Sequence, residues 1–177
     1  MIRSFPDEPI EPKESPPLSF EDREGREITV DNYDDDFEDV VGMYLDFEPA
    51  DRAQGIPPTG EADIRSWLDH ILVDDAINVV ARHQHRVIGH AVLVPDRSDA
   101  YELAIFVLNA YQGAGIGTQL MEALLGRGQD EGIEYVWLTV ERWNQAAIRL
   151  YKKMGFEESD PEGFELEMTA CLLRSPD

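Results

Sequence analysis

A glycine-rich turn at residues 112–117 is the segment of this sequence with the composition of an anion site. It reads Gln-Gly-Ala-Gly-Ile-Gly, between a strand-like stretch that ends near Leu108 and a stretch with helical spacing of apolar residues from about Gly115. Successive small residues let backbone N–H groups face outward without a side-chain clash. The first N–H groups of a helix lie at the positive end of its dipole. The turn is therefore suited to a phosphate or a diphosphate.

Two common phosphate-binding motifs do not describe this turn. No Gly-Lys-Ser/Thr follows it, which excludes a Walker loop. A dinucleotide fingerprint follows the first strand of a βαβ unit, whereas three strand-like stretches precede this turn. These stretches, at residues 76–82, 87–94 and 101–108, are separated by short turns and predict an antiparallel meander.

The remaining elements follow from the spacing of apolar residues. After the turn we expect a helix over about 115–127, a strand over 134–140, a helix over 144–154 and a strand over 164–172. Before the meander we expect a short strand near 27–30, a helix after Asp36 and a helix over 61–72. The strand–helix–strand crossover implies two parallel strands. The prediction is an α/β (α+β) fold with a mixed sheet of six to seven strands and about four helices.

A second motif lies about thirty residues beyond the turn. Residues 144–156 fit the pattern Asn-x-x-Ala-x-x-x-Tyr-x-x-x-Gly-Phe. Together with Gln-x-x-Gly-x-Gly in the turn, this resembles the GNAT superfamily of N-acetyltransferases over about residues 27–170. The resemblance implies one GNAT domain over 26–174, acetyl-CoA as co-substrate, and direct transfer of an acetyl group to a primary amine of a protein lysine or a small molecule.

The resemblance also implies where the cofactor binds. The backbone of Ile105, Phe106 and Val107 would hold the pantetheine arm, and an N–H near Phe106 or Val107 would stabilise the oxyanion. Asn144 would contact the cofactor arm, although a role as helix N-cap alone is the alternative. The turn residues implied to bind the cofactor are Gln112, Gly113, Ala114, Gly115, Ile116, Gly117 and Thr118.

Tyr151 and Glu102 are the catalytic candidates. Tyr151 matches the family tyrosine that protonates the leaving thiolate, with a purely structural core aromatic as the alternative. The amine must lose a proton to a base, and Thr139 stands where some relatives that acetylate protein N-termini carry a glutamate. The segment around Glu102 is similar to that of Pat-like protein lysine acetyltransferases, in which a glutamate is the base. Glu102 is therefore the first choice and Glu141 the second, unless Glu102 is only a solvated carboxylate at a strand end.

A non-catalytic GNAT-fold acyl-CoA-binding sensor or interaction module is the alternative function. Intact Tyr151 and Glu102 favour the enzyme. We expect no metal, and because Cys171 is the only cysteine, an internal disulfide or a Cys-based zinc cluster is excluded. The expected partners are acetyl-CoA and an amine acceptor, and the expected oligomeric state is a monomer or a homodimer.

The charge balance narrows the class of protein further. The 177 residues include 15 Lys and Arg against 37 Asp and Glu, a formal net charge of −22. This charge argues against binding to nucleic acid or to an anionic membrane. No apolar run of about 18 residues exists, and the first residues lack an apolar signal region, so we expect a cytoplasmic protein. Because the acids are spread along the chain and most cations are arginines, we expect a halophilic archaeal source, where KCl screens self-repulsion.

Such an acidic chain needs local cations to bind an anionic cofactor. Arg142, Arg149, Lys152 and Lys153 lie close together in sequence, and our hypothesis is that some of them face the nucleotide end. The alternative is that they only balance charge on a helix surface.

Residues 1–25 differ in composition from the rest of the chain. Prolines alternate there with acidic residues, and large apolar side chains are few. Such a segment buries little apolar surface to offset the entropy of ordering it. We therefore expect a disordered, acidic, proline-rich tail before the domain.

Overall fold

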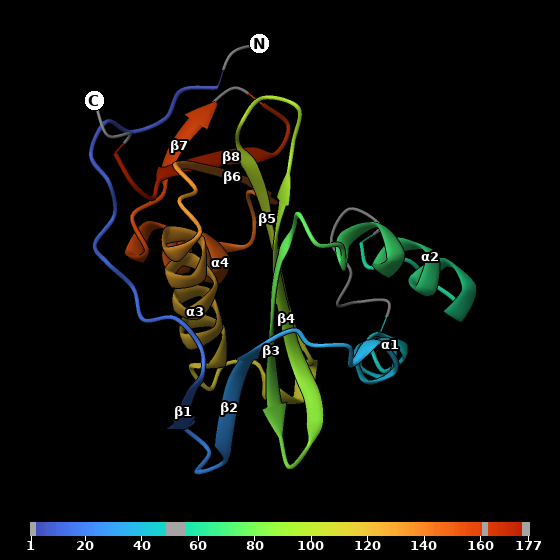
Figure 1. The fold of residues 1–177 in the computed structure, drawn as a ribbon. Helices are drawn as coiled ribbons and strands as arrows, with labels where there is room; N and C mark the ends of the chain where they lie inside the picture. The colour runs from blue at the N-terminus through green and yellow to red at the C-terminus, as the bar shows by residue number, and fades with distance from the viewer. Residues whose placement is uncertain (1–2, 49–55, 161–162, 175–177) are drawn as a thin grey trace.

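A computed structural model describes residues 3–48, 56–160 and 163–174 of the chain. A mixed eight-stranded sheet runs through the molecule in the order β1-β2-β3-β4-β5-β6-β8-β7 (Figure 1). The strands are β1 Leu18–Glu21, β2 Glu27–Asn32, β3 Ile77–His83, β4 Arg86–Pro95, β5 Tyr101–Val107, β6 Tyr135–Val140, β7 Glu157–Asp160 and β8 Leu166–Cys171. The α-helices of the described residues are α1 Phe37–Leu45, α2 Glu61–Ile71, α3 Ile116–Asp130 and α4 Gln145–Lys153.

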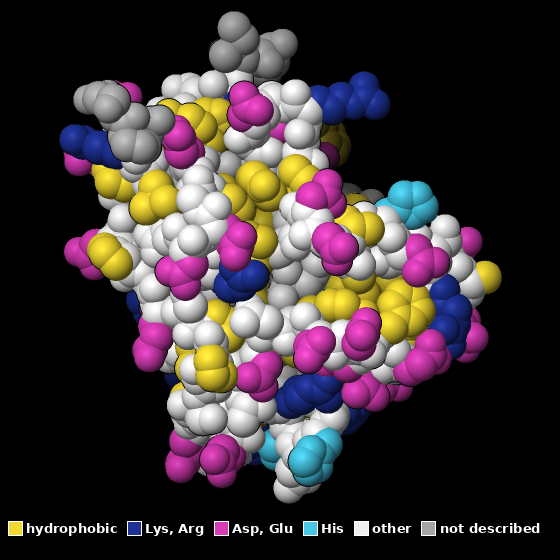
Figure 2. Space-filling view, viewed as in Figure 1, with side chains coloured by type: hydrophobic (Ala, Val, Ile, Leu, Met, Phe, Trp, Pro, Cys, Tyr) yellow, Lys and Arg dark blue, Asp and Glu magenta, His cyan; other side chains and the backbone are white. Residues whose placement is uncertain are grey.

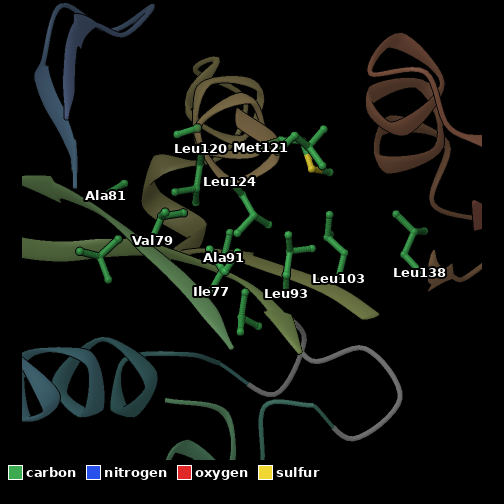
Figure 3. Close-up of a cluster of buried hydrophobic side chains, with 14 of the residues drawn as sticks. Ile77, Val79, Ala81, Ala91, Leu93, Leu103, Leu120, Met121, Leu124 and Leu138 are labelled. Atoms are coloured by element: carbon green, nitrogen blue, oxygen red, sulfur yellow. The ribbon is translucent and has the colours of Figure 1, made fainter. Parts of the chain in front are cut away.

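The helices cover the sheet from both sides. Helices α3 and α4 lie on one side of the sheet, and α1 and α2 lie on the other (Figure 1). The apolar face of α3, which includes Leu120, Met121 and Leu124, points onto the central strands and meets Leu93 and Leu103 there (Figure 3). These positions recur every three to four residues in α3, so the helix buries a continuous apolar stripe.

The strand connections confirm the predicted topology. Strands β1 to β5 pair consecutively as an antiparallel meander, and β5 pairs with β6 in parallel after the crossover through α3. Strand β8 lies between β6 and β7 and is antiparallel to both. The sheet is larger than the six to seven strands that we expected. Among the strands we had not assigned, β7 reads Glu-Glu-Ser-Asp and, as an edge strand, lacks the apolar alternation of a buried one.

Residues 3–17, here called the leading segment, differ from the disordered tail that we expected over residues 1–25. The leading segment lies along the domain: the N–H of Ile10 donates to the carbonyl oxygen of Cys171 at 2.8 Å, and the N–H of Lys13 donates to Oε1 of Gln129 at 2.9 Å. Strand β1 follows it and pairs with β2 in register from Leu18↔Val30 to Glu21↔Glu27.

Two glycines on the domain explain this close docking. A Cβ added to Gly126 would lie 2.7 Å from the carbonyl oxygen of Lys13, and one added to Gly155 would lie 2.6 Å from Cγ2 of Ile10. The absence of side chains at these positions lets the backbone of the leading segment approach α3, and lets the side chain of Ile10 pack on the chain just after α4. The composition of the leading segment does not show that these two distant glycines leave space for it on the domain.

None of the described helices combines the length and the apolar character that crossing a membrane requires.

Candidate active site

The two central parallel strands diverge soon after they meet. Strand β5 pairs with β6 at only two positions, Tyr101↔Val136 and Glu102↔Trp137, although both strands continue beyond them. From Leu103 onward, the edge of β5 therefore faces a wedge-shaped gap instead of a neighbouring strand.

A cavity of about 330 Å³ occupies this gap. Its walls come from residues 102–107 of β5, from residues 139–141 at the end of β6, and from Gln112, Asn144 and Tyr151. The structure thus brings together the predicted strand residues, both catalytic candidates and Asn144 around one space. The turn residues from Gly113 to Thr118 are not part of this lining and lie beyond Gln112 along the chain.

The hydrogen-bond alternation of β5 decides which of its backbone groups face the gap. The N–H of Leu108 donates to the carbonyl oxygen of Ile88 at 2.9 Å, which directs Leu108 and, two residues earlier, Phe106 toward β4. The N–H and C=O groups of Ile105 and Val107 consequently point to the opposite edge, into the gap. Of the two N–H groups that we named for the oxyanion, the one on Phe106 is directed away from the cavity and the one on Val107 toward it.

The glycine-rich turn adopts a backbone that its composition permits. Gly113 and Gly115 have φ angles of +74° and +89°, in the left-handed region that glycine enters without strain. Helix α3 starts directly after Gly115, so the N–H groups of Ile116, Gly117 and Thr118 belong to its first turn and have no intrahelical acceptor. Gly113 is exposed and Gly117 is half-buried, which leaves this face of the turn open to solvent.

Tyr151 lies on α4 and lines the cavity. The side chain is 9% exposed, and burial raises the pKa of its phenol to about 12. Its ring lies 6.1 Å from that of Phe156, so the residue also packs in the core. Among the described residues, no group makes a hydrogen bond with its hydroxyl. At neutral pH the phenol therefore keeps a proton that is available to a ligand.

Glu102 stands at the rim of the same cavity. Burial by the surrounding atoms raises the pKa of its carboxyl group, Arg3 opposes this rise and Asp96 adds to it. Arg3 is held nearby because its guanidinium stacks 3.5 Å from the ring centroid of Trp137 and pairs with Glu167 at 2.7 Å. Glu141, the second candidate base, lines the cavity too, so position alone does not separate the two.

Asn144 has the structural role that we gave as its alternative. Its Oδ1 accepts a hydrogen bond from the N–H of Ala147 at 3.2 Å, which caps the start of α4. The residue nevertheless lines the cavity. The cap holds the first turn of α4, and thereby the helix that carries Tyr151, against the gap.

Aromatic side chains from α1 and α2 form the support behind Phe106. The rings of Tyr44 and Trp67 each lie 5.6 Å from the Phe106 ring, in edge-to-face contact. Phe47 lies 6.2 Å from Phe106 and also lines the cavity. The fold brings these aromatic residues to β5 although they lie far from it in the chain.

A row of buried, hydrogen-bonded polar side chains fixes the position of Tyr44. Its hydroxyl lies 2.6 Å from Nδ1 of His90, whose Nε2 lies 2.7 Å from Oδ1 of Asn78. The amide of Asn78 donates to the carbonyl oxygen of Ile71 at 2.9 Å, so its Oδ1 accepts from His90 and the Tyr44 hydroxyl donates to the other ring nitrogen. Burial lowers the pKa of His90 to about 3, so the ring is neutral. The sequence signal was two polar residues inside apolar strands, which we did not use.

The four cations that we grouped have different surroundings. Arg142 donates to the carbonyl oxygen of Gly163 at 2.7 Å, and Lys152 pairs with Glu158 at 3.7 Å. Arg149 and Lys153 are exposed on α4. The hypothesis that some of these residues serve the nucleotide remains a prediction.

The sequence model of the acetyltransferase (GNAT) family matches residues 33–156, which is more than half of the chain. This chain belongs to the GNAT family. The match spans α1 through the end of α4 and includes the glycine-rich turn, β5 and Tyr151. Among the described residues, no group of three or more His, Cys, Asp or Glu side chains is placed to hold a metal ion.

A sequence relative and two solved structures place the GNAT domain among known proteins. A protein of Mycobacterium bovis, named as an uncharacterized N-acetyltransferase, is 36% identical over 89 residues, which are 50% of this chain and 57% of that protein. The chain thus spans little more than half the length of this relative. The GNAT domain of PAT from S. lividans has a TM-score of 0.73 at 19% identity, with 88% of this chain and 97% of that one covered. YncA of Salmonella typhimurium, solved with its cofactor acetyl-CoA, has a TM-score of 0.66 at 20% identity, with 85% and 96% covered. The two solved structures are similar to this chain in fold.

Proposed function

We propose that this GNAT protein is an acetyl-CoA-dependent N-acetyltransferase that transfers an acetyl group directly to a primary amine, either of a protein lysine or of a small molecule. The observation that carries the proposal is the separation of β5 from β6. It opens a cavity in which a backbone edge, a phenol with an unused proton and a carboxylate meet.

The residues present fit acetyl-CoA as the group bound in this gap. The outward N–H and C=O groups of Ile105 complement the amides of a pantetheine arm, as a neighbouring strand would. The N–H of Val107 is left for the acetyl oxygen. The open N–H groups of Gly113 to Thr118 complement a diphosphate. Gln112 joins the two parts, because its Nε2 donates to the carbonyl oxygen of Val107 at 2.9 Å. When bound, acetyl-CoA supplies the activated thioester.

Three groups of the chain would then serve the transfer. Glu102 accepts the proton of the incoming amine, since only the neutral amine is a nucleophile. The N–H of Val107 stabilises the negative charge that develops on the acetyl oxygen. Tyr151 donates its proton to the departing sulfur. The amine nitrogen forms a bond to the acetyl carbon as the carbon–sulfur bond breaks. The second proton of the nitrogen returns to the Tyr151 phenolate and Glu102 releases its proton to solvent, so the products are the amide and CoA thiol.

We propose that the acceptor is an amine that carries a positive charge before it enters the cavity. Glu102 and Glu141 place two carboxyl groups at the cavity, which attracts an ammonium group before it loses its proton. A lysine side chain and a small amine share this chemistry.

One experiment separates the enzyme from the acyl-CoA sensor. Acetyl-CoA is titrated into the protein in molar KCl by calorimetry, and thiol release is then followed with amines, lysine peptides and host proteins. We expect micromolar binding and acceptor-dependent thiol release. Binding without release from any acceptor would favour the sensor, and the absence of both heat and a thermal shift would remove the cofactor proposal.

We also propose a concentrated-salt cytoplasm, of the kind found in halophilic archaea, as the working environment. Acidic side chains are scattered over the viewed face and are not gathered in one patch (Figure 2). With a net charge of −22, such a surface gains from screening by salt. A monomer or a homodimer remains our prediction for the oligomeric state, and neither nucleic acid nor membrane is expected as a partner.

A further inference from the structure

The loop between β1 and β2, residues 22–26, lies directly against the glycine-rich turn. The N–H of Arg23 donates to the carbonyl oxygen of Ala114 at 3.0 Å. The guanidinium of Arg26 lies 4.3 Å from the ring centroid of Tyr111, in the short helical turn just before the glycines, and donates to the carbonyl oxygen of Ala110 at 3.3 Å. These contacts fix the loop to residues 110–114, which lead into and form part of the glycine-rich turn.

A buried carboxylate gives this loop a defined shape. Asp22 accepts hydrogen bonds from the N–H groups of Glu24 at 3.0 Å and Arg26 at 2.9 Å, and its other oxygen accepts from Nε of Arg26 at 2.8 Å. The loop therefore holds the backbone of Arg23 in place. Its side chain extends along the turn, because a Cβ built on Gly115 would lie 3.8 Å from Nε of Arg23.

The positive charge of Arg23 is not used in an ion pair within the described part of the chain. Among the described residues, Arg23 has no acidic partner, although the sequence holds 37 Asp and Glu against 15 cations. By contrast, Arg65 pairs with Glu38 at 2.7 Å and Arg86 pairs with Asp46 at 2.7 Å. Arg23 instead lies beside the N-terminal end of α3, whose dipole is also positive. Two positive groups side by side repel each other unless an anion binds between them.

We propose that Arg23 is a cofactor-binding residue whose guanidinium contacts the diphosphate of CoA held on the glycine-rich turn. The inference rests on the proposed function, and it assigns to the β1–β2 loop a part of the site that lies outside the region matched by the family model. A planar guanidinium offers paired N–H donors to phosphate oxygens. The turn amides bind the diphosphate from one side and Arg23 binds it from the loop side.

Binding of three ligands to four proteins tests the assignment. CoA, 3′-dephospho-CoA and pantetheine, which lacks the diphosphate, are titrated by calorimetry into the unmodified protein, Arg23→Gln, Arg23→Lys and Arg97→Gln. The titrations use the lowest KCl concentration that keeps all four folded. Arg97 is the matched control, because it is exposed, has no acidic partner among the described residues, and lies in the turn between β4 and β5.

The expected pattern is specific to the diphosphate. Arg23→Gln should lower the affinity for CoA and for 3′-dephospho-CoA by about the same factor, roughly tenfold for a charge-assisted pair. The affinity for pantetheine should not change. Arg23→Lys should recover part of the loss and Arg97→Gln should show none. Because Arg23 is exposed, its variants should unfold at the same temperature as the parent.

Each other result overturns the assignment in a recognisable way. A loss of affinity for CoA alone would show that Arg23 contacts the 3′-phosphate instead of the diphosphate. An equal loss of affinity in Arg97→Gln would show a general effect of net charge. Full affinity in Arg23→Gln would remove Arg23 from the site while leaving the proposed function intact. If the unmodified protein binds none of the ligands, the proposed function itself fails.

Discussion

At the scale of single residues, Tyr151 and Glu102 line the same cavity, and their proposed roles in proton transfer are opposite. Burial raises the pKa of both groups, to about 12 for Tyr151 and above its ordinary value for Glu102. A raised pKa keeps the phenol protonated as a donor. For the carboxylate, it brings the basicity closer to the pH at which an amine must be deprotonated.

Replacement of Tyr151 by phenylalanine tests the donor. The change removes the hydroxyl and keeps the ring that packs beside Phe156. We expect turnover to fall roughly 10- to 1000-fold with cofactor affinity nearly unchanged, because the proton is needed only as the thiolate leaves. Steady-state kinetics and calorimetry measure the two quantities, with Tyr135→Phe as a control on β6. Unchanged turnover in Tyr151→Phe would leave the residue a purely structural role.

Replacement of Glu102 by glutamine tests the base through pH. A base works only when deprotonated, so kcat/KM should decrease as the pH falls through the raised pKa of Glu102. Glu102→Gln should lower the rate and flatten this acid limb, as pH–rate profiles would show. Glu141→Gln is the matched variant, since Glu141 lines the same cavity. A pH–rate profile that changes only in Glu141→Gln would identify Glu141 as the base instead of Glu102.

Sequence reasoning located single residues where a local motif carried them. Glu102, Asn144 and Tyr151 lie at motif positions, and the structure places all three around one cavity. His90 and Arg23 were missed because their significance depends on partners far away in the chain. No local pattern links Arg23 to Gly115, which it reaches only after β1 and β2 have joined the sheet.

At the scale of elements, two helical glycines offer a contrast. Gly126 in α3 faces the backbone of the leading segment, with an added Cβ 2.7 Å from the carbonyl oxygen of Lys13. Gly42 in α1 is exposed, and an added Cβ would meet nothing within 4 Å. The same substitution should therefore have opposite effects at the two positions.

Alanine at each position measures the docking of the leading segment. Gly42→Ala should stabilise the fold by up to about 1 kcal/mol through helix propensity. Gly126→Ala should destabilise it by roughly 1–3 kcal/mol, because backbone atoms must move apart. Urea unfolding in constant KCl gives both free energies. If Gly126→Ala matched Gly42→Ala in sign, the close approach of the leading segment to α3 would be contradicted.

The meander and the crossover were predictable because each strand carries its own apolar pattern and each connection is short. Strand β1 was not, since Leu-Ser-Phe-Glu follows a proline-rich stretch and becomes a strand only through β2. The separation of β5 from β6 was equally invisible. Both strands look continuous in sequence, and the gap depends on how far their pairing extends.

At the scale of the whole molecule, we expect the net charge of −22 to have the largest effect on stability. The Debye length is about 3 Å in 1 M salt and about 10 Å in 0.1 M salt, so dilution exposes each surface carboxylate to its neighbours. Within the described residues, ion pairs such as Arg65–Glu38 involve a minority of the acids, and the remaining carboxylates repel one another.

Salt should therefore set the stability of the fold. We expect the midpoint of thermal unfolding to fall markedly between about 2 M and 0.1 M KCl, with unfolding at the low end, as followed by circular dichroism. Neutral sucrose at matched osmolarity is the control for non-ionic effects. A midpoint that stays constant across this range would contradict the proposed adaptation to salt.

The leading segment also has a consequence for biosynthesis. The leading segment leaves the ribosome long before Gln129 and Cys171, which supply the groups that bind it. Contacts so distant along the chain form late, since the intervening loop must close first. A nascent chain stalled before β8 should therefore leave this stretch accessible to a protease, and exit of Cys171 from the ribosome should protect it.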